Sequence, residues 1–242
     1  MNQLPRFFYN GPLAENNTVS LDEATAKHVW QVLRMQANDK VALTDGKGVV
    51  AEGTIHTAER HRCNVIIEKV TFHERKDIML YLCVSFTKNN SRNEWLLEKA
   101  TELGVGAIIP ISTKRSEKTY FRHDRWQKIL MSSILQSQQY YLPELSDITP
   151  LKNILKEYKQ IPQKLVAHCI DDKNKQPLSK MLKPATETIL LIGPEGDFTQ
   201  EEVNLCIEHG FKPVSLGMQR LRTETAAITA GAFFNVINDG QN

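Results

Sequence analysis

The stretch from Thr188 to Thr199, TILLIGPEGDFT, decides the fold class of this 242-residue chain. An apolar run ends at Gly193, a short loop follows, and Thr199 with Glu202 forms a capping-box pair that predicts the start of a helix. A buried strand, a glycine-containing loop and a helix in direct succession are typical of a parallel sheet covered by helices.

The same alternation continues on both sides of this stretch. Apolar runs that predict strands are IMLYLCVSF from Ile78, VGAIIPIS from Val105, KLVAHCI from Lys164 and VSL from Val214. Helices are predicted at about 94–103 and 124–139, from 199 onward, and at about 223–237. Residues 75–242 are therefore expected to form an α/β domain with a mostly parallel sheet.

Residues 1–74 follow a different pattern. Short β-like runs cover 41–44, 48–55 and 63–71, and the residues Asp45 to Gly48, DGKG, suit a tight hairpin turn. One helix is predicted, with Ser20 and Glu23 as a capping box and an approximate apolar stripe of Leu21, Ala24, Val29, Val32 and Leu33. We expect a small β-barrel that carries one helix.

Composition excludes several classes of protein. Hydrophobic residues make up 41% and charged residues 24%, which is ordinary for a globular chain and rules out wholesale disorder. The 30 basic and 28 acidic residues are too balanced to identify a nucleic-acid binder from bulk charge. The four cysteines show no C-x-x-C pair or zinc-ligand spacing, so each is expected to be a reduced, buried thiol. Because no export signal or membrane span is visible, a cytoplasmic location is expected.

Two loops are candidates for ligand binding. Gly193 to Phe198 and Gly217 to Thr225 each follow a predicted strand and precede a helix, where ligands of parallel sheets bind. Their glycines allow close backbone approach and positive φ, although a strand–helix turn could need glycine for its geometry alone. The chain lacks GxxxxGK[ST], GxGxxG and GxSxG, so a nucleoside-like cofactor held by main-chain groups suits these loops better than a phosphate-rich one.

Several motifs together carry a family resemblance. They are IGPEGDFTQEE (192–202), LGMQRLRTETAAITA (216–230), KNNSRNEWLLEKATELGV (88–105), LPRFF (4–8), HVWQVLR (28–34) and DGKG (45–48). The chain resembles the SPOUT-class methyltransferases that methylate N3 of a uridine in small-subunit (16S) ribosomal RNA. The resemblance implies a C-terminal domain with a trefoil knot that binds S-adenosylmethionine, an N-terminal PUA-like barrel that helps to hold RNA, and a homodimer. By motif match, the cofactor pocket would be lined by Ile192, Gly193, Gly196, Leu216, Gly217, Leu221 and Thr223.

The reaction itself suggests catalytic residues. N3 of uracil becomes nucleophilic only when its proton leaves, so the site needs proton removal and alignment and needs no metal. Arg222 is the leading candidate for stabilising negative charge on the uracil ring. Glu224 could accept the proton or orient Arg222, or it could be an ordinary glutamate at a helix start. Glu195 is expected to shape its own turn.

RNA binding is expected where positive charge is local. Residues 114–128, KRSEKTYFRHDRWQK, hold six Lys or Arg against two acidic residues, interleaved with aromatic side chains. Basic groups neutralise phosphates and aromatic rings stack on unpaired bases, so this segment favours RNA, although a solvated helix face with Trp126 in the core is the alternative. The expected RNA contacts are Lys114, Arg115 and Arg122, with Lys88 and Arg92 near a helix start and Arg6, His28 and Arg34 at family motif positions in the barrel. His28 could equally be a packed core histidine.

The chain departs from the family pattern at two positions. An arginine common in the family after Gln136-Ser137 is replaced by Gln139, and one common two residues after Gly217 is replaced by Gln219, with Arg220 one place later. Both changes weaken the transfer of RNA contacts more than they weaken the cofactor pocket. Two other functions remain open at this point, namely a related methyltransferase acting on another RNA or atom, and a catalytically silent RNA-binding module.

Overall fold

The computed structural model describes residues 4–75, 78–117 and 121–239. The chain divides into two compact units. The first contains the residues up to Arg75 together with Ile134–Leu142, and the second contains the remainder of the chain. Each unit has its own sheet, and each is described by itself.

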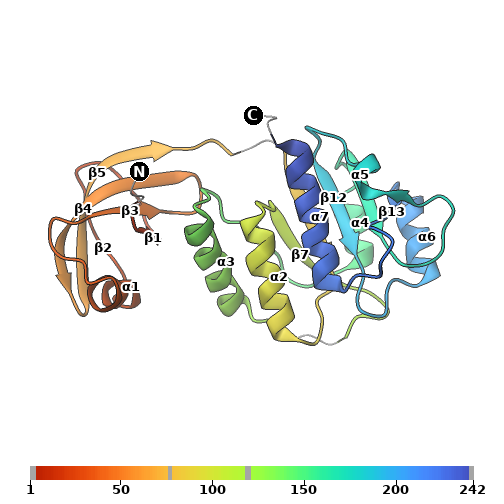
Figure 1. The fold of residues 1–242 in the computed structure, drawn as a ribbon, viewed down its shortest axis with the longest axis horizontal. Helices are drawn as coiled ribbons and strands as arrows, with labels where there is room; N and C mark the ends of the chain where they lie inside the picture. Colours follow the sequence, from red (N-terminus) through yellow and green to blue (C-terminus); the bar gives the residue numbers. More distant parts are fainter. Residues whose placement is uncertain (1–3, 76–77, 118–120, 240–242) are drawn as a thin grey trace. The chain divides into compact units, whose positions relative to one another are not determined.

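The sheet of the first unit has five strands in the order β1-β3-β4-β5-β2 (Figure 1). The strands are β1 (Arg6–Phe8), β2 (Thr18–Ser20), β3 (Lys40–Thr44), β4 (Val49–Glu59) and β5 (Arg62–Phe72). The predicted turn joins β3 to β4, where Gly46 and Gly48 have φ of 68° and 100° and the Asp45 carboxylate accepts hydrogen bonds from the main-chain N–H of Lys47 and Val49. Glycine adopts such φ values more readily than residues with a Cβ, so the DGKG turn favours this hairpin register.

The helical segment of the first unit differs from the prediction. Helix α1 (Glu23–Lys27) is capped by Asp22, whose side chain accepts a hydrogen bond from Thr25 N–H, so the predicted Ser20–Glu23 capping box is wrong. A π-helical turn, η1 (His28–Val32), follows directly. Because π-helical winding places more residues in a turn, the 3.6-residue stripe is lost after Val29, and Val32 is 63% exposed.

A segment far along the chain completes the first unit. Gly48 N–H donates to the carbonyl of Tyr140, and Leu142 N–H donates to the carbonyl of Gly46. The rings of His73 and Tyr140 stack with their centroids 3.6 Å apart. The 134–142 segment therefore belongs structurally to the β-rich unit, although it follows the expected boundary at residue 74 by some sixty positions.

The second unit is built on an eight-stranded sheet in the order β11-β13-β10-β12-β6-β7-β8, with β9 paired to β7 (Figure 1). All of its strand pairings are parallel. The strands are β6 (Leu80–Val84), β7 (Ala107–Ser112), β8 (Glu144–Leu145), β9 (Thr149–Pro150), β10 (Gln163–Ala167), β11 (Gln176–Pro177), β12 (Thr188–Ile192) and β13 (Lys212–Ser215). The predicted α/β class with a parallel sheet is confirmed.

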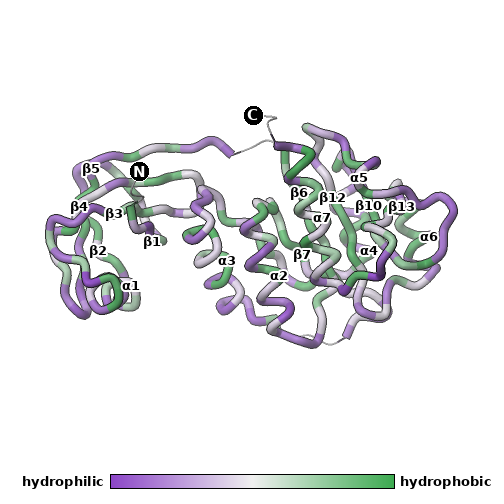
Figure 2. Tube along the Cα trace, in the orientation of Figure 1, coloured by the Kyte–Doolittle hydropathy of each residue, from purple (hydrophilic) through white to green (hydrophobic). Residues whose placement is uncertain are grey.

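Helices cover both faces of this sheet. They are α2 (Asn90–Glu102), α3 (His123–Ser137), α4 (Leu151–Glu157), α5 (Leu178–Met181), α6 (Gln200–Glu208) and α7 (Thr223–Asn238). On one face, apolar side chains of α4 and α6 pack on the strands in a single cluster that includes Ile154, Val203 and Ile189. Helix α7 packs on β6 and β12, with α2 beside it. Figure 2 shows the apolar central strands between these more polar helices.

Two further expectations concern the thiols and membrane spans. Cys63, Cys83 and Cys206 are buried, as expected, but Cys169 is exposed at the end of the predicted KLVAHCI run, where β10 has already ended. Within the described part of the chain, no helix is long and apolar enough to cross a membrane.

Candidate cofactor site

A cavity of about 550 Å³ lies where β10, β12 and β13 end. These three strands are neighbours in the sheet and run parallel, so the loops that leave their carboxyl ends meet at one edge. Six of the seven residues expected to hold a cofactor line the cavity, namely Ile192, Gly193, Leu216, Gly217, Leu221 and Thr223. Gly196 is not among the lining residues.

The loop between β12 and α6 makes a tight turn on one side of the cavity. Asp197 N–H donates to the carbonyl of Pro194, and Asp197, with φ of 62°, is the residue of this loop in the left-handed region. The positive φ that the glycines of this loop permit is thus adopted by Asp197 and by neither Gly193 nor Gly196. Gly193 is needed for close packing instead, since a Cβ there would lie 3.0 Å from the Phe198 ring. The predicted capping box of Thr199 and Glu202 then starts α6.

The loop between β13 and α7 forms the opposite side. Gly217 has φ of 136°, a conformation that residues with a Cβ rarely adopt, and open space surrounds it. The buried hydroxyl of Thr223 donates to the carbonyl of Gly193 at 3.1 Å. This hydrogen bond ties the two predicted loops together across the cavity.

A third wall was not anticipated from the sequence. It consists of Ala167, the last residue of β10, the following His168 and Cys169, and Lys175. The Asp197 carboxylate accepts a hydrogen bond from Cys169 N–H at 2.7 Å, and Lys175 Nζ donates to the carbonyls of His168 and Ile170. The KLVAHCI run predicts a strand, but its sequence does not reveal that β10 lies between β12 and β13.

His168 brings a buried imidazole to this wall. Neither ring nitrogen has a hydrogen-bond partner among the described residues, and burial, with the charge of Lys175 as a second cause, lowers the pKa of His168. The ring is therefore neutral at neutral pH.

Arg92 of α2, which lines the cavity, links the carboxylate of Glu195, also a lining residue, to that of Glu224, which is not among the lining residues. Its Nη1 lies 2.8 Å from Glu195 Oε1, and its Nε lies 3.6 Å from Glu224 Oε1. Glu224 is 7% exposed, and its second carboxylate oxygen is buried with no hydrogen-bond partner in the part of the chain that the structure describes. An orienting contact from Glu224 to Arg222 was one expectation from the sequence, but the ion pair observed is with Arg92.

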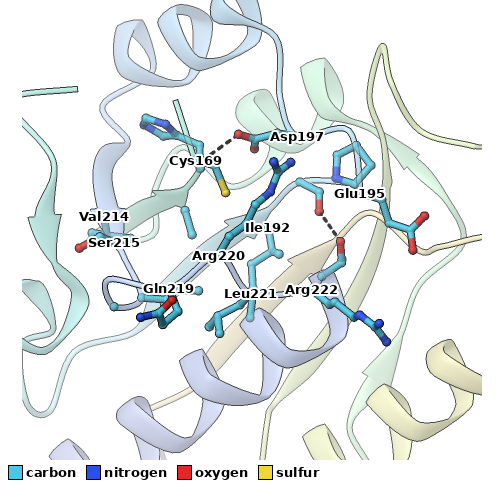
Figure 3. A pocket seen from close by; sticks show the side chains of 18 of the residues that line it. Cys169, Ile192, Glu195, Asp197, Val214, Ser215, Gln219, Arg220, Leu221 and Arg222 are labelled. Atoms are coloured by element: carbon cyan, nitrogen blue, oxygen red, sulfur yellow. Dashed lines mark hydrogen bonds between the residues drawn. The ribbon is translucent and has the colours of Figure 1, made fainter. Parts of the chain in front are cut away.

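Two arginines of the loop after β13 line the cavity and diverge. In Figure 3 the Arg220 side chain extends toward Asp197, whereas the Arg222 side chain extends to the opposite side. Gln219 also lines the cavity. Arg220, one residue after the position where the family pattern has an arginine, thus brings a cation to the cavity.

The expected RNA-binding residues of the second unit are mostly exposed. Lys88, Lys114, Arg115 and Arg122 are exposed, and Arg92 is partly buried. Lys88 lies 3.7 Å from Glu117, and Arg115 donates a hydrogen bond to the carbonyl of Gly196. Trp126 is fully buried against Phe86 and Phe121, so it belongs to the core. Lys118 and Tyr120 of the basic segment lie outside the described residues.

The expected RNA-binding residues of the first unit have different surroundings. Arg6 donates to the carbonyl of Gln138 at 3.0 Å and lies over the Tyr140 ring, so it already has internal partners. His28 is exposed, with the Phe7 ring edge-on to it, which contradicts the alternative of a packed core histidine. Arg34, with φ of 55°, lines a separate hollow of this unit.

The chemistry of the cavity suits a nucleoside-like ligand. Main-chain groups of two loops and the apolar side chains of Ile192, Leu216 and Leu221 line it, while Arg92, Arg220 and Arg222 add positive charge. Such a site can hold an uncharged ring system and attract a polyanion. Among the described residues, no group of three or more His, Cys, Asp or Glu is arranged to hold a metal ion.

Comparisons with known proteins were made on the whole chain. Residues 74–235 match the model of the RNA methyltransferase domain family, and residues 21–68 match that of the RNA methyltransferase PUA domain. The chain is 29% identical to ribosomal RNA small subunit methyltransferase E of Synechocystis sp., over 91% of this chain and 73% of that protein. It is 32% identical to the protein of the same name from Mesomycoplasma hyopneumoniae, over 67% and 72% of the two chains.

The solved structures of similar fold include one with a bound ligand. It is ribosomal RNA small subunit methyltransferase E from Neisseria gonorrhoeae bound to S-adenosyl methionine. The TM-score is 0.85 at 29% identity, and the match covers 98% of both chains.

Proposed function

Because the chain belongs to the RNA methyltransferase family, we propose that it transfers a methyl group from S-adenosylmethionine to N3 of a uridine in small-subunit (16S) ribosomal RNA. The observation that carries this proposal is the cavity at the ends of β10, β12 and β13, lined by both predicted loops. Residues 75–242 would carry out the transfer, and residues 1–74, the PUA-like part, would help to hold the RNA.

The loops supply the contacts that a nucleoside-containing methyl donor needs. Main-chain groups of Gly193, Leu216 and Gly217 can bind its polar edges, while Ile192 and Leu221 cover its flat ring. When bound, S-adenosylmethionine supplies an activated methyl group on a sulfonium. Gly196, which lies outside the cavity lining, would contribute only to the shape of its loop.

The arginine and glutamate at the start of α7 have complementary roles in this proposal. In the transfer, the bond from N3 to the methyl carbon forms as the carbon–sulfur bond breaks, and the N3 proton must pass to a base. Glu224 is a candidate acceptor because one of its oxygens is buried and unpaired. Arg222 would stabilise the negative charge that develops on the uracil carbonyl oxygens, and Arg92 would hold Glu224 in place.

RNA would reach the site along the exposed cations. Lys88, Lys114, Arg115 and Arg122, with the partly buried Arg92, would neutralise phosphates near the cavity, and Arg6, His28 and Arg34 would form a separate contact surface on the first unit. We also propose a homodimer, which rests on the family resemblance alone, because the small residues Ala226, Ala230 and Gly231 of α7 are buried within this chain.

The proposal is tested by nucleoside analysis of small-subunit RNA from cells that lack the protein. The expected result is loss of 3-methyluridine at one position, restored by the parent gene and not by a gene encoding Arg222→Ala. Unchanged 3-methyluridine would contradict the proposal, and loss of a different methylated nucleoside would point to another target atom.

A further inference from the structure

Residues 193–199, the loop between β12 and α6, are called the cofactor loop below. Arg115 contacts this loop from a neighbouring loop of the second unit, the one between β7 and α3. Arg115 Nη1 donates to the carbonyl of Gly196 at 2.8 Å. A Cβ at Gly196 would lie 3.4 Å from the Arg115 Cβ, so the base of the arginine side chain packs against this glycine. Arg115 is exposed, and this contact is therefore not imposed by burial in the core.

The same neighbouring loop is attached at two further points. Glu202 Oε2 accepts a hydrogen bond from Thr199 N–H in the capping box, while its Oε1 accepts one from Lys114 N–H at 2.7 Å. Ser116 Oγ lies 2.6 Å from Ser85 Oγ, and Ser85 N–H donates to the carbonyl of Ile192. The loop between β7 and α3 is thus attached near both ends of the cofactor loop. Arg115 contacts the middle of the cofactor loop, at Gly196.

We propose that Arg115 is a positioning residue for the cofactor loop as well as an RNA contact. Its hydrogen bond to Gly196 holds the Pro194–Asp197 turn, whose residues Pro194, Glu195 and Asp197 line the cavity. A guanidinium has five N–H donors, so the remaining ones stay available to a phosphate. The inference rests on the proposed function for the identity of the ligand, S-adenosylmethionine.

Lys114 provides a matched control. Lys114→Ala and Arg115→Ala each remove one cation from the same exposed loop, so they change the local charge equally. Only Arg115→Ala removes the contact to Gly196, because Lys114 is attached through its main-chain N–H, which the substitution retains. Arg115→Lys keeps the charge and shortens the reach of the donor.

Two measurements without RNA test the inference. Calorimetry gives the affinity for S-adenosylmethionine, and hydrogen exchange of the ligand-free protein reports the mobility of residues 193–199. We expect Arg115→Ala to weaken binding by about tenfold, the size of one charge-assisted hydrogen bond, and to speed exchange in this loop. Lys114→Ala should leave the affinity and the exchange rate close to those of the parent protein. Arg115→Lys should give values between those of the parent protein and those of Arg115→Ala.

The result that overturns the inference is equal behaviour of Arg115→Ala and Lys114→Ala in both measurements. Failure of the parent protein to bind S-adenosylmethionine would count against the proposed function instead. The exchange comparison would still decide whether Arg115 positions the loop.

Discussion

Arg222 and Glu224 are two residues apart in the sequence but lie in different environments. Arg222 is exposed at the start of α7, whereas Glu224 is buried beside Arg92. A buried carboxylate oxygen without a partner among the described residues lowers stability, and such groups are common at functional sites. We therefore assign charge stabilisation to Arg222 and proton transfer to Glu224 in the proposed reaction.

Replacement of Arg222 tests the first assignment. Because Arg222 caps α7 through its main-chain carbonyl and not through its side chain, Arg222→Ala should leave folding and S-adenosylmethionine binding largely intact. Loss of charge stabilisation should slow methyl transfer by about tenfold or more. Single-turnover rates together with calorimetry measure the two effects, and near-normal turnover would remove Arg222 from the chemistry.

Replacement of Glu224 by glutamine tests the second assignment, that of proton transfer to Glu224. Glu224→Gln keeps the shape of the side chain but cannot accept the proton, so the rate of transfer should fall by about tenfold or more. The free energy of unfolding should change little. Arg92, which loses its charged partner Glu224, is partly exposed and keeps its ion pair with Glu195. Glu195→Gln is the matched control, since it removes the other carboxylate from Arg92. An equal loss of rate in both variants would mean that the carboxylates act only by placing Arg92.

At the level of the elements, the loop between β13 and α7 depends on the conformation of one glycine. Gly217→Ala meets open space but must adopt a φ of 136°, which costs about 1–3 kcal/mol. The free energy of unfolding should fall by part of this amount, and S-adenosylmethionine should bind more weakly because the loop relaxes. Denaturant titration and calorimetry measure both, and unchanged values would show that the loop is not held in this conformation.

The elements that the sequence predicts well are those with long periodic patterns. The strands β6, β7 and β12 and the helices α2, α3, α6 and α7 all appear close to their predicted bounds. Helices α4 and α5 were missed because seven and four residues give too little periodicity. The helix near His28 was predicted with the wrong exposed face because nothing in HVWQVLR signals a π-helical turn.

At the level of the whole molecule, strand order is what the sequence could not supply. Two walls of the cavity were predicted because their loops contain distinctive motifs. The third wall, with His168 and Lys175, comes from a strand with an ordinary apolar pattern, and only the pairing of β10 with β12 and β13 places it at the site. The Arg115–Gly196 contact was missed for the same reason, since it joins positions 81 residues apart.

The overall charge of the chain does not reveal the proposed RNA-binding segment. The net charge of +2 is small, yet Lys114, Arg115 and Arg122 are all exposed within one short segment. Changing these three to glutamine should reduce the slope of log affinity for RNA against log salt concentration by about 2. A control variant that neutralises Lys152, Lys156 and Lys159, exposed residues in and just after α4, removes the same charge elsewhere. Equal slopes in the two variants would count against the 114–122 segment as an RNA contact.

The most direct test of the whole account is methyl transfer by the purified protein. Small-subunit ribosomal RNA or subunits from cells lacking the enzyme would be incubated with methyl-labelled S-adenosylmethionine, then digested to nucleosides and analysed by mass spectrometry. We expect label in 3-methyluridine at a single position, and its loss with Arg222→Ala. Label on another nucleoside or atom, or no transfer by a protein that binds S-adenosylmethionine, would contradict it.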